Sequence, residues 1–170
     1  MFSVTRNEET EGTEATGDTG DTGIELGFLL GLGFQLLIGE FTRRLGAAGY
    51  GDLRPAHGMA FQVLKGGGAT GTELGERLGV TKQAAGQLVD DLEKRGYVRR
   101  EPHPGGGRRK LVVLTPAAQE HLAVAGRVLH ELEAELGTRV DLPALRRELT
   151  GLLRALGGDG ELPPLRPVWH

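Results

Sequence analysis

The sequence predicts a mostly α-helical fold with a small β wing, and three observations lead to that prediction. Residues 70–96 form two short amphipathic patterns joined by a tight turn, as in a helix-turn-helix. Residues 97–114 read as two β-strands joined by a basic, Pro/Gly-rich loop, which is where a wing would follow. Residues 24–48 and 116–157 read as long helices with much apolar surface. Together these features predict a winged helix-turn-helix DNA-binding domain combined with a helical dimerisation domain.

The two short helices follow from the spacing of apolar residues and from the turn between them. Gly79 can adopt the positive φ that a sharp turn needs, and Thr81 stands where the second helix requires an N-cap. Gly75 is small enough to let the second helix cross closely over the first. The apolar positions at helical spacing are Leu74 and Leu78 on the first helix and Ala85, Leu88 and Leu92 on the second.

The start of the second helix carries small and polar side chains that fit the major groove of DNA. Gln can pair with adenine and Lys with guanine, so these side chains are expected to reach base edges. They are Lys82, Gln83, Ala84 and Gln87.

Charge is distributed unevenly along the chain, although the net charge is only −3. Residues 1–23 hold six Asp and Glu against Arg6 alone, whereas residues 77–110 hold nine Lys and Arg against four Asp and Glu. The basic excess therefore coincides with the predicted helix-turn-helix and wing, as a polyanionic partner requires.

The first long helix, predicted from residue 24 to about residue 48, is apolar around most of its circumference. Glu25, Gln35 and Glu40 interrupt the apolar run, so we expect a buried helix and no membrane span. A second copy of the chain is expected to cover part of this helix.

The remaining elements are predicted from turn and cap signals. Pro favours the first turn of a helix, glycines end one, and alternation of apolar residues between turns indicates strands. The expected elements are a helix from Pro55 to about Lys65, strands at 97–100 and 110–114, and helices beginning at Thr115-Pro116 and after residues 141–143.

These elements divide the chain into three parts. Residues 1–23 are expected to be a disordered acidic tail, because they contain too few apolar residues to offset the entropy of ordering. Residues 24–157 form the body, and residues 158–170 a Pro-rich tail. Within the body, residues 24–50 and 116–157 are dimerisation helices and residues 53–114 are the DNA-binding lobe, with the wing at 97–114.

The sequence contains little material for catalysis, so an enzyme, a metal site and a cofactor are not expected. The chain has no Cys, Ser3 is its single serine, and its five histidines lack the spacing of metal ligands. The glycines within residues 66–71 match G-x-G-x-x-G, with Asp90 and Asp91 about twenty residues on. A helical pattern precedes them where a dinucleotide site needs a strand, so an interhelical loop is the better interpretation. The acidic N-terminus is unlike a signal peptide, and a cytoplasmic protein is expected.

The order of elements resembles the MarR family of winged-helix transcriptional regulators. The resemblance covers about residues 24–157 and is most specific in LRPAHGMAFQVL (53–64), in TELGERLGVTKQAAGQLVDDLEKRGYVRR (72–100) and in GRRKLVVLTPAAQEHL (107–122). The family's wing has an Asp-x-Arg followed by Leu-Thr. Here Arg108 and Leu114-Thr115 fit that pattern, whereas Gly106 replaces the Asp and Arg109 adds a charge. The wing tip is therefore expected to be more mobile than is usual in the family.

We therefore predict a dimeric, sequence-specific DNA-binding repressor that places one recognition helix from each subunit in consecutive major grooves of a pseudo-palindromic operator. By the family resemblance, a small aromatic or anionic ligand releases it from DNA. The alternatives are a winged-helix protein-interaction module without DNA readout and the nucleotide-dependent enzyme that the glycines suggest. The predicted DNA contacts are Thr72, Thr81, Lys82, Gln83, Ala84, Gln87, Arg108, Arg109 and Lys110, and the predicted ligand contacts are Phe28, Leu32, Leu53, His57 and Phe61.

Overall fold

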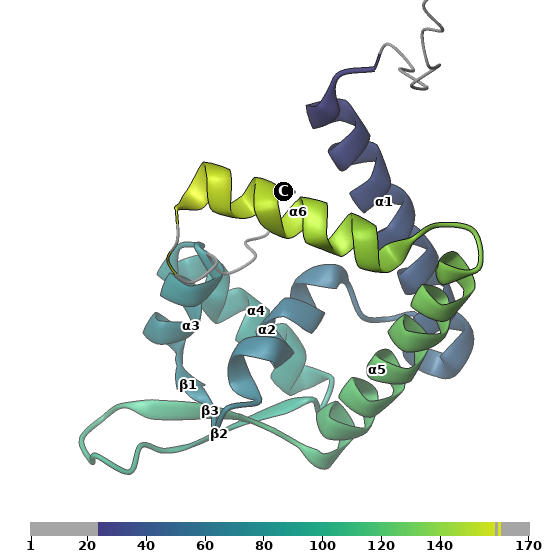
Figure 1. Cartoon of the computed structure of the whole chain (residues 1–170). Helices are drawn as coiled ribbons and strands as arrows, with labels where there is room; N and C mark the ends of the chain where they lie inside the picture. The colour runs from purple at the N-terminus through teal and green to yellow at the C-terminus, as the bar shows by residue number, and fades with distance from the viewer. Residues whose placement is uncertain (1–23, 159, 161–170) are drawn as a thin grey trace, which may run out of the picture.

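The computed structural model describes residues 24–158 and 160 and shows a helical molecule with one small sheet (Figure 1). The predicted acidic tail lies outside the described residues, as does most of the predicted C-terminal tail. In chain order the elements are α1 (Leu26–Leu45), η1 (Gly46–Tyr50, a π-helical turn), α2 (Pro55–Leu64), β1 (Ala69–Thr70), α3 (Gly71–Leu78), α4 (Lys82–Lys94), β2 (Val98–Pro102), β3 (Lys110–Leu114), α5 (Pro116–Gly137) and α6 (Leu142–Gly157).

The helix-turn-helix of α3 and α4 has the predicted turn and caps. Gly79 ends α3 with a φ of 67°, and the side chain of Thr81 accepts a hydrogen bond from the backbone N–H of Ala84 at 3.1 Å. A Cβ atom on Gly75 would lie 3.4 Å from the Cβ of Ala85, so the two helices do cross closely there. The spacing and the small residue therefore determine this unit, as predicted.

The sheet has three antiparallel strands in the order β1-β3-β2, whereas the sequence analysis predicted only the hairpin of β2 and β3. The third strand, β1, contains two residues and pairs Ala69 with Val112. A strand this short has no alternation of apolar residues to detect. Gly68 leads into it with a φ of 91°, and a Cβ atom there would lie only 2.6 Å from the carbonyl oxygen of Val112. This glycine of the apparent nucleotide fingerprint is therefore required by close packing against β3.

The core lies between α2, α3, α4 and the sheet, and α5 closes one side of it. Ala118 brings α5 into this core and has no exposed surface. The largest fully buried side chains of the core are those of Phe61, Leu64, Leu74, Leu78, Leu92 and Val89. The core therefore fixes α4 on the lobe through its buried face and leaves the opposite face exposed.

The two ends of the body, α1 and α6, remain largely uncovered within one chain, and the start of α1 projects away from the lobe (Figure 1). Arg44 joins the end of α1 to α5 through its ion pair with Glu135. The exposed large apolar side chains on α1 are those of Leu26, Phe28, Leu29, Leu30, Leu32, Leu36 and Leu37, and those on α6 are Leu145, Leu153 and Leu156.

The segment Leu26–Tyr50 is long and apolar enough, by length and composition alone, to cross a membrane. Its mean hydropathy is 1.2, and none of the apolar window is buried within the chain. Uncovered helices of soluble assemblies have the same properties, so this segment by itself is weak support for a membrane span.

Candidate nucleic-acid interface and adjoining cavity

The first turn of α4 presents the predicted base-reading residues on an exposed face. Lys82, Gln83 and Ala84 follow the Thr81 cap directly, and Gln87 lies one turn further along the same helix. All are exposed, and none of the residues in that turn is acidic. A helix N-terminus also presents free backbone N–H groups and the positive end of the helix dipole. This end of α4 therefore suits contact with the anionic phosphate backbone of DNA and with the edges of its bases.

The predicted DNA contact Thr72 lies at the beginning of α3. Thr72 is exposed in the first turn, but Thr70 is the N-cap. The backbone N–H of Thr70 donates to Glu73 at 2.7 Å, which lowers the pKa of the Glu73 carboxyl, and the backbone N–H of Glu73 donates to the Thr70 hydroxyl at 3.3 Å. The pattern Thr-x-x-Glu is a capping box, a signal in the sequence that identifies this helix start.

The wing carries the other predicted DNA contacts, and all three are exposed. Arg108 and Arg109 lie in the loop between β2 and β3, and Lys110 is the first residue of β3, paired with Pro102. The backbone N–H of Gly106 donates to the carbonyl of His103 at 2.8 Å, which forms a tight turn at the tip.

Ion pairs divide the nine cations of residues 77–110 into two groups. Arg95, Arg99 and Arg100 are held by carboxylates of the chain itself: Arg95 by Asp91 and Asp52, Arg99 by Glu101, and Arg100 by Asp90 and Glu93. The others have no ion pair within the described part of the chain, and they are Arg77, Lys82, Lys94, Arg108, Arg109 and Lys110. Of these unpaired cations, Lys82 lies at the start of α4, and Arg108, Arg109 and Lys110 lie in the wing.

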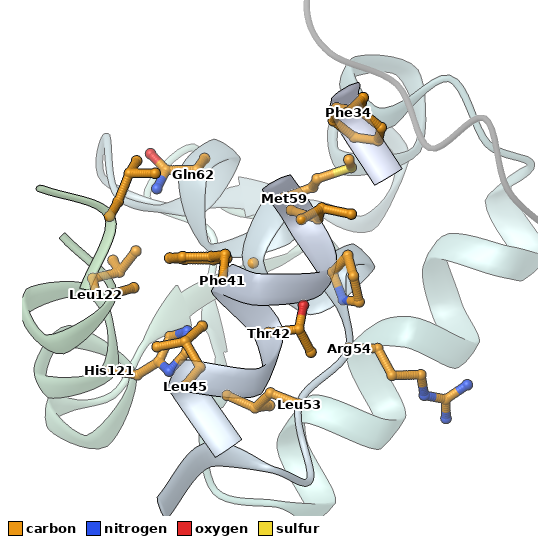
Figure 2. A pocket seen from close by; sticks show the side chains of 15 residues that line it. Phe34, Phe41, Thr42, Leu45, Leu53, Arg54, Met59, Gln62, His121 and Leu122 are labelled. Carbon is orange, nitrogen blue, oxygen red and sulfur yellow. The ribbon is translucent and has the colours of Figure 1, made fainter. Parts of the chain in front are cut away.

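A cavity of about 300 Å³ lies behind this lobe, with side chains from α1, α2 and α5 around it (Figure 2). Its wall is mostly apolar, and Arg54 extends away from its centre into solvent. The lining residues are Phe34, Ile38, Phe41, Thr42, Leu45, Leu53, Arg54, Pro55, Gly58, Met59, Gln62, His121, Leu122, Ala125 and Leu129.

The structure does not bring the five predicted ligand contacts together, and only Leu53 lines the cavity. Phe28 and Leu32 lie exposed on the outer part of α1. Phe61 has no exposed surface because it belongs to the core, and His57 is only 2% exposed. The other four positions therefore lie outside this cavity, because helical periodicity shows which residues are apolar and not which face of a helix adjoins a cavity.

His57 is a structural residue of the lobe. Its Nδ1 accepts a hydrogen bond from the backbone N–H of Arg54 at 3.1 Å, so in the neutral ring the proton lies on Nε2. Nε2 lies 3.1 Å from a carboxylate oxygen of Asp91 on α4. Burial lowers the pKa of His57, although Asp91 opposes this effect. The ring therefore connects the start of α2 to α4.

His121 of α5 lies where the cavity meets an aromatic cluster. It is 3% exposed, and its ring packs edge-on against Tyr50 at 4.7 Å and Phe61 at 5.3 Å between centroids. Its Nδ1 has no hydrogen-bond partner within the described residues. Burial lowers the pKa of this imidazole too, which favours its neutral form.

Residues 52–109 match the family model described as "MarR family", and this segment contains the complete helix-turn-helix and most of the wing. This segment, about a third of the chain, is similar to the MarR family. The family and its fold are those of transcription regulators. The resemblance that the sequence analysis described is therefore confirmed.

Two further comparisons agree with the family. The chain is 39% identical over 70 residues to the uncharacterized HTH-type transcriptional regulator YcgE of Bacillus subtilis. That alignment covers 41% of this chain and 46% of YcgE, so it spans about half of the curated relative. The fold is similar to the crystal structure of RV1404 from Mycobacterium tuberculosis, with a TM-score of 0.67 and 21% identity over 84% of this chain and 97% of that one.

A third comparison is with a structure that contains DNA. A mutant of MepR from S. aureus, bound to an oligodeoxyribonucleotide, has a TM-score of 0.57 and 18% identity to this chain. The match covers 78% of this chain and 99% of the MepR chain. At this identity the likeness shows the fold.

Proposed function

We propose that this chain is a sequence-specific, dimeric DNA-binding transcription regulator that acts in the cytoplasm as a repressor. The observation that carries the proposal is the exposed start of α4, where polar side chains, a helix N-terminus and unpaired cations occur together without a carboxylate in the first turn. A major groove accepts an α-helix presented in this way. The oligonucleotide bound to the MepR mutant supports double-stranded DNA as the partner of this fold.

The uncovered apolar face of α1 and α6 supports a homodimer. Leu36 is 74% exposed and Leu156 is 79% exposed, and such residues recur along both helices. A contiguous apolar surface of this kind marks an interface. A second copy is the natural occupant, because a twofold axis brings the same surface of each copy together. The dimer would place two copies of α4 about 10 bp apart on a pseudo-palindromic site.

A dimer interface would also explain why α1 has so much exposed apolar surface, with no need for the helix to span a membrane. Glu40 of α1 is held by Arg43 and Arg44, and Arg44 also binds Glu135, so the end of this helix is tied to α5 by charged side chains. Such a cluster suits a helix that packs on protein and not on lipid.

The cavity beside α2 is the proposed effector site, and Leu53 is the predicted ligand contact that lines it. Its apolar wall suits a small aromatic body, and Arg54 at the rim suits an anionic group. By the family resemblance, a ligand there would release the repressor from DNA.

Substitution of the recognition-helix glutamines tests this function. Gln83→Ala and Gln87→Ala should each cost ~1–3 kcal/mol of discrimination at one base pair, because each removes a bidentate base contact. The measurement is competition binding to a duplex enriched from a random-sequence pool and to its single-base variants. Gln119→Ala, an exposed position on α5, is the matched control and should change nothing. Unchanged base preference in both α4 variants would reject α4 as the reading helix.

A further inference from the structure

One short stretch, residues 52–57, lies between the cavity and the recognition helix. Leu53, Arg54 and Pro55 line the cavity from this stretch. Leu53 is only 8% exposed, so a molecule in the cavity would contact it directly. The stretch joins η1 to the first turn of α2 and therefore belongs to the wall of the cavity.

Other side chains of the same stretch bind the C-terminal end of α4. Arg95, the residue that follows α4, donates to the carboxylate of Asp52 at 3.1 Å and to its backbone carbonyl at 3.0 Å. Arg95 also donates to Asp91 at 2.9 Å, and Asp91 lies 3.1 Å from His57. We refer to Asp52, Arg95, Asp91 and His57 as the clamp.

The clamp is better placed to transmit a displacement than an open surface pair would be. The side chains of Arg95 and Asp91 are each about 30% exposed and His57 is buried, whereas Asp52 is 45% exposed, so solvent screens the bonds to Asp91 less than the bond to the Asp52 carboxylate. The hydrogen bond from Arg54 to His57 also joins the middle of the stretch to its end. Because Asp52 is the neighbour of Leu53, a displacement of this stretch also displaces the two Asp52 oxygens that accept from Arg95.

We propose that the clamp positions α4 for DNA and that a molecule in the cavity changes DNA affinity by displacing residues 52–57, and with them the Asp52–Arg95 bonds. Asp52 and Arg95 are positioning residues in this account and do not contact DNA themselves. The proposal rests on the proposed function, since it explains how the cavity and the DNA-binding face of the same regulator communicate. It requires only that an occupied cavity favours a different position of the stretch.

The natural absence of Cys allows a direct test with a covalent probe. Ala125 of α5 lines the cavity, so Ala125→Cys followed by benzyl methanethiosulfonate places one benzyl ring inside it. Ala123→Cys, at an exposed position on the same helix, carries the same ring into solvent as the matched control. Dithiothreitol removes the ring and restores each starting protein.

Affinity for the enriched duplex is then measured with and without the ring, in the intact chain and with the clamp cut by Arg95→Met, which removes both bonds to Asp52. With the clamp intact, the ring at position 125 should change affinity by about tenfold, a typical allosteric coupling, and the ring at position 123 by less than about twofold. In the Arg95→Met background the effect at position 125 should also fall below about twofold, and Arg95→Lys, which keeps a donor, should restore part of it.

Two results would overturn the proposal: an equal effect of the ring with the clamp cut, or no effect of the ring with the clamp intact. Amide exchange of residues 82–94, measured without DNA, provides the second readout and should change with the ring only while Arg95 is present. If the protein binds no duplex selectively, the proposed function fails, and this exchange measurement still decides whether the cavity acts on α4. Circular dichroism of each variant confirms that it has folded.

Discussion

Gly68 is the residue whose replacement should be most costly for its size. An alanine there would bring its Cβ to 2.6 Å from the carbonyl oxygen of Val112 and would retain a φ of 91°. We expect Gly68→Ala to lower the free energy of unfolding by about 1–3 kcal/mol, since both strain and a steric clash must be absorbed. Urea unfolding of the variant and of the unsubstituted protein measures this difference in the free energy of unfolding. Gly66→Ala, where a Cβ meets nothing within 4 Å, is the control, and an equal loss at both positions would contradict the packing role.

The two buried histidines should make the protein less stable in mild acid. Burial lowers the pKa of both His57 and His121 below the ordinary 6.5, so the unfolded chain binds more protons than the folded one as the pH falls through 6.5. Stability should therefore be complete above pH 6.5 and should decline below it, towards the lower pKa of the folded state.

Urea midpoints at pH 7.5 and 5.5, at one protein concentration, test this dependence. His121→Phe keeps a ring beside Tyr50 and Phe61 but removes the titrating group, so this variant should lose less stability between the two pH values. A midpoint that is equal or higher at pH 5.5 in the unsubstituted protein would contradict the expected sign.

At the scale of single elements, the wing should bind DNA through charge and not through a fixed geometry. Arg108 has no ion pair within the described residues, whereas Arg99 of β2 is held by Glu101 at 2.7 Å. Arg108→Ala should reduce the slope of log affinity against log salt by about one, because one phosphate contact is lost. Arg99→Ala should leave the slope nearly unchanged. Equal slopes in the two variants would mean that the wing does not reach the backbone.

Comparison of the predicted and observed helices and strands shows which features of the fold could be predicted from the sequence. Gly79, Thr81 and the apolar spacing were sufficient to predict α3, α4 and the turn between them, because these signals act within a few residues. β1 was missed because its pairing with β3 is a long-range contact of a two-residue strand. The lining of the cavity could not be predicted for a related reason: Leu53 and Phe61 are both buried apolar residues, and only the packing of α1, α2 and α5 decides which of them borders the cavity.

The sequence indicated where the predicted DNA-binding face lies, but it did not indicate which charges on that face are free to bind DNA. Residues 77–110 contain nine cations, and composition does not show that Arg95, Arg99 and Arg100 are bound to carboxylates of the chain. Asp91 and Arg95 have the i, i+4 spacing that favours an ion pair along one helix. The pairs of Arg100 with Asp90 and Glu93 depend on how β2 lies beside α4, which the sequence does not show.

At the scale of the whole molecule, the exposed apolar face of α1 should hold two copies together. Leu36→Glu introduces a charge at a position that is 74% exposed in one chain, and we expect it to shift the protein from dimer to monomer because a buried charge is costly. Sedimentation velocity across a concentration series measures the shift. Gln119→Glu on α5 adds the same charge outside this face and should leave the dimer intact. A monomeric unsubstituted protein at all concentrations would reject the interface.

The most direct test of the central claim is binding of the purified protein to its enriched duplex and to a scrambled duplex across a salt series. We expect a preference for the enriched duplex that persists at physiological salt, with two subunits per site, since base contacts by α4 do not depend on counterion release. Equal, weak binding of both duplexes that disappears steeply with salt would contradict the claim. It would show that the basic face attracts polyanions without reading a sequence.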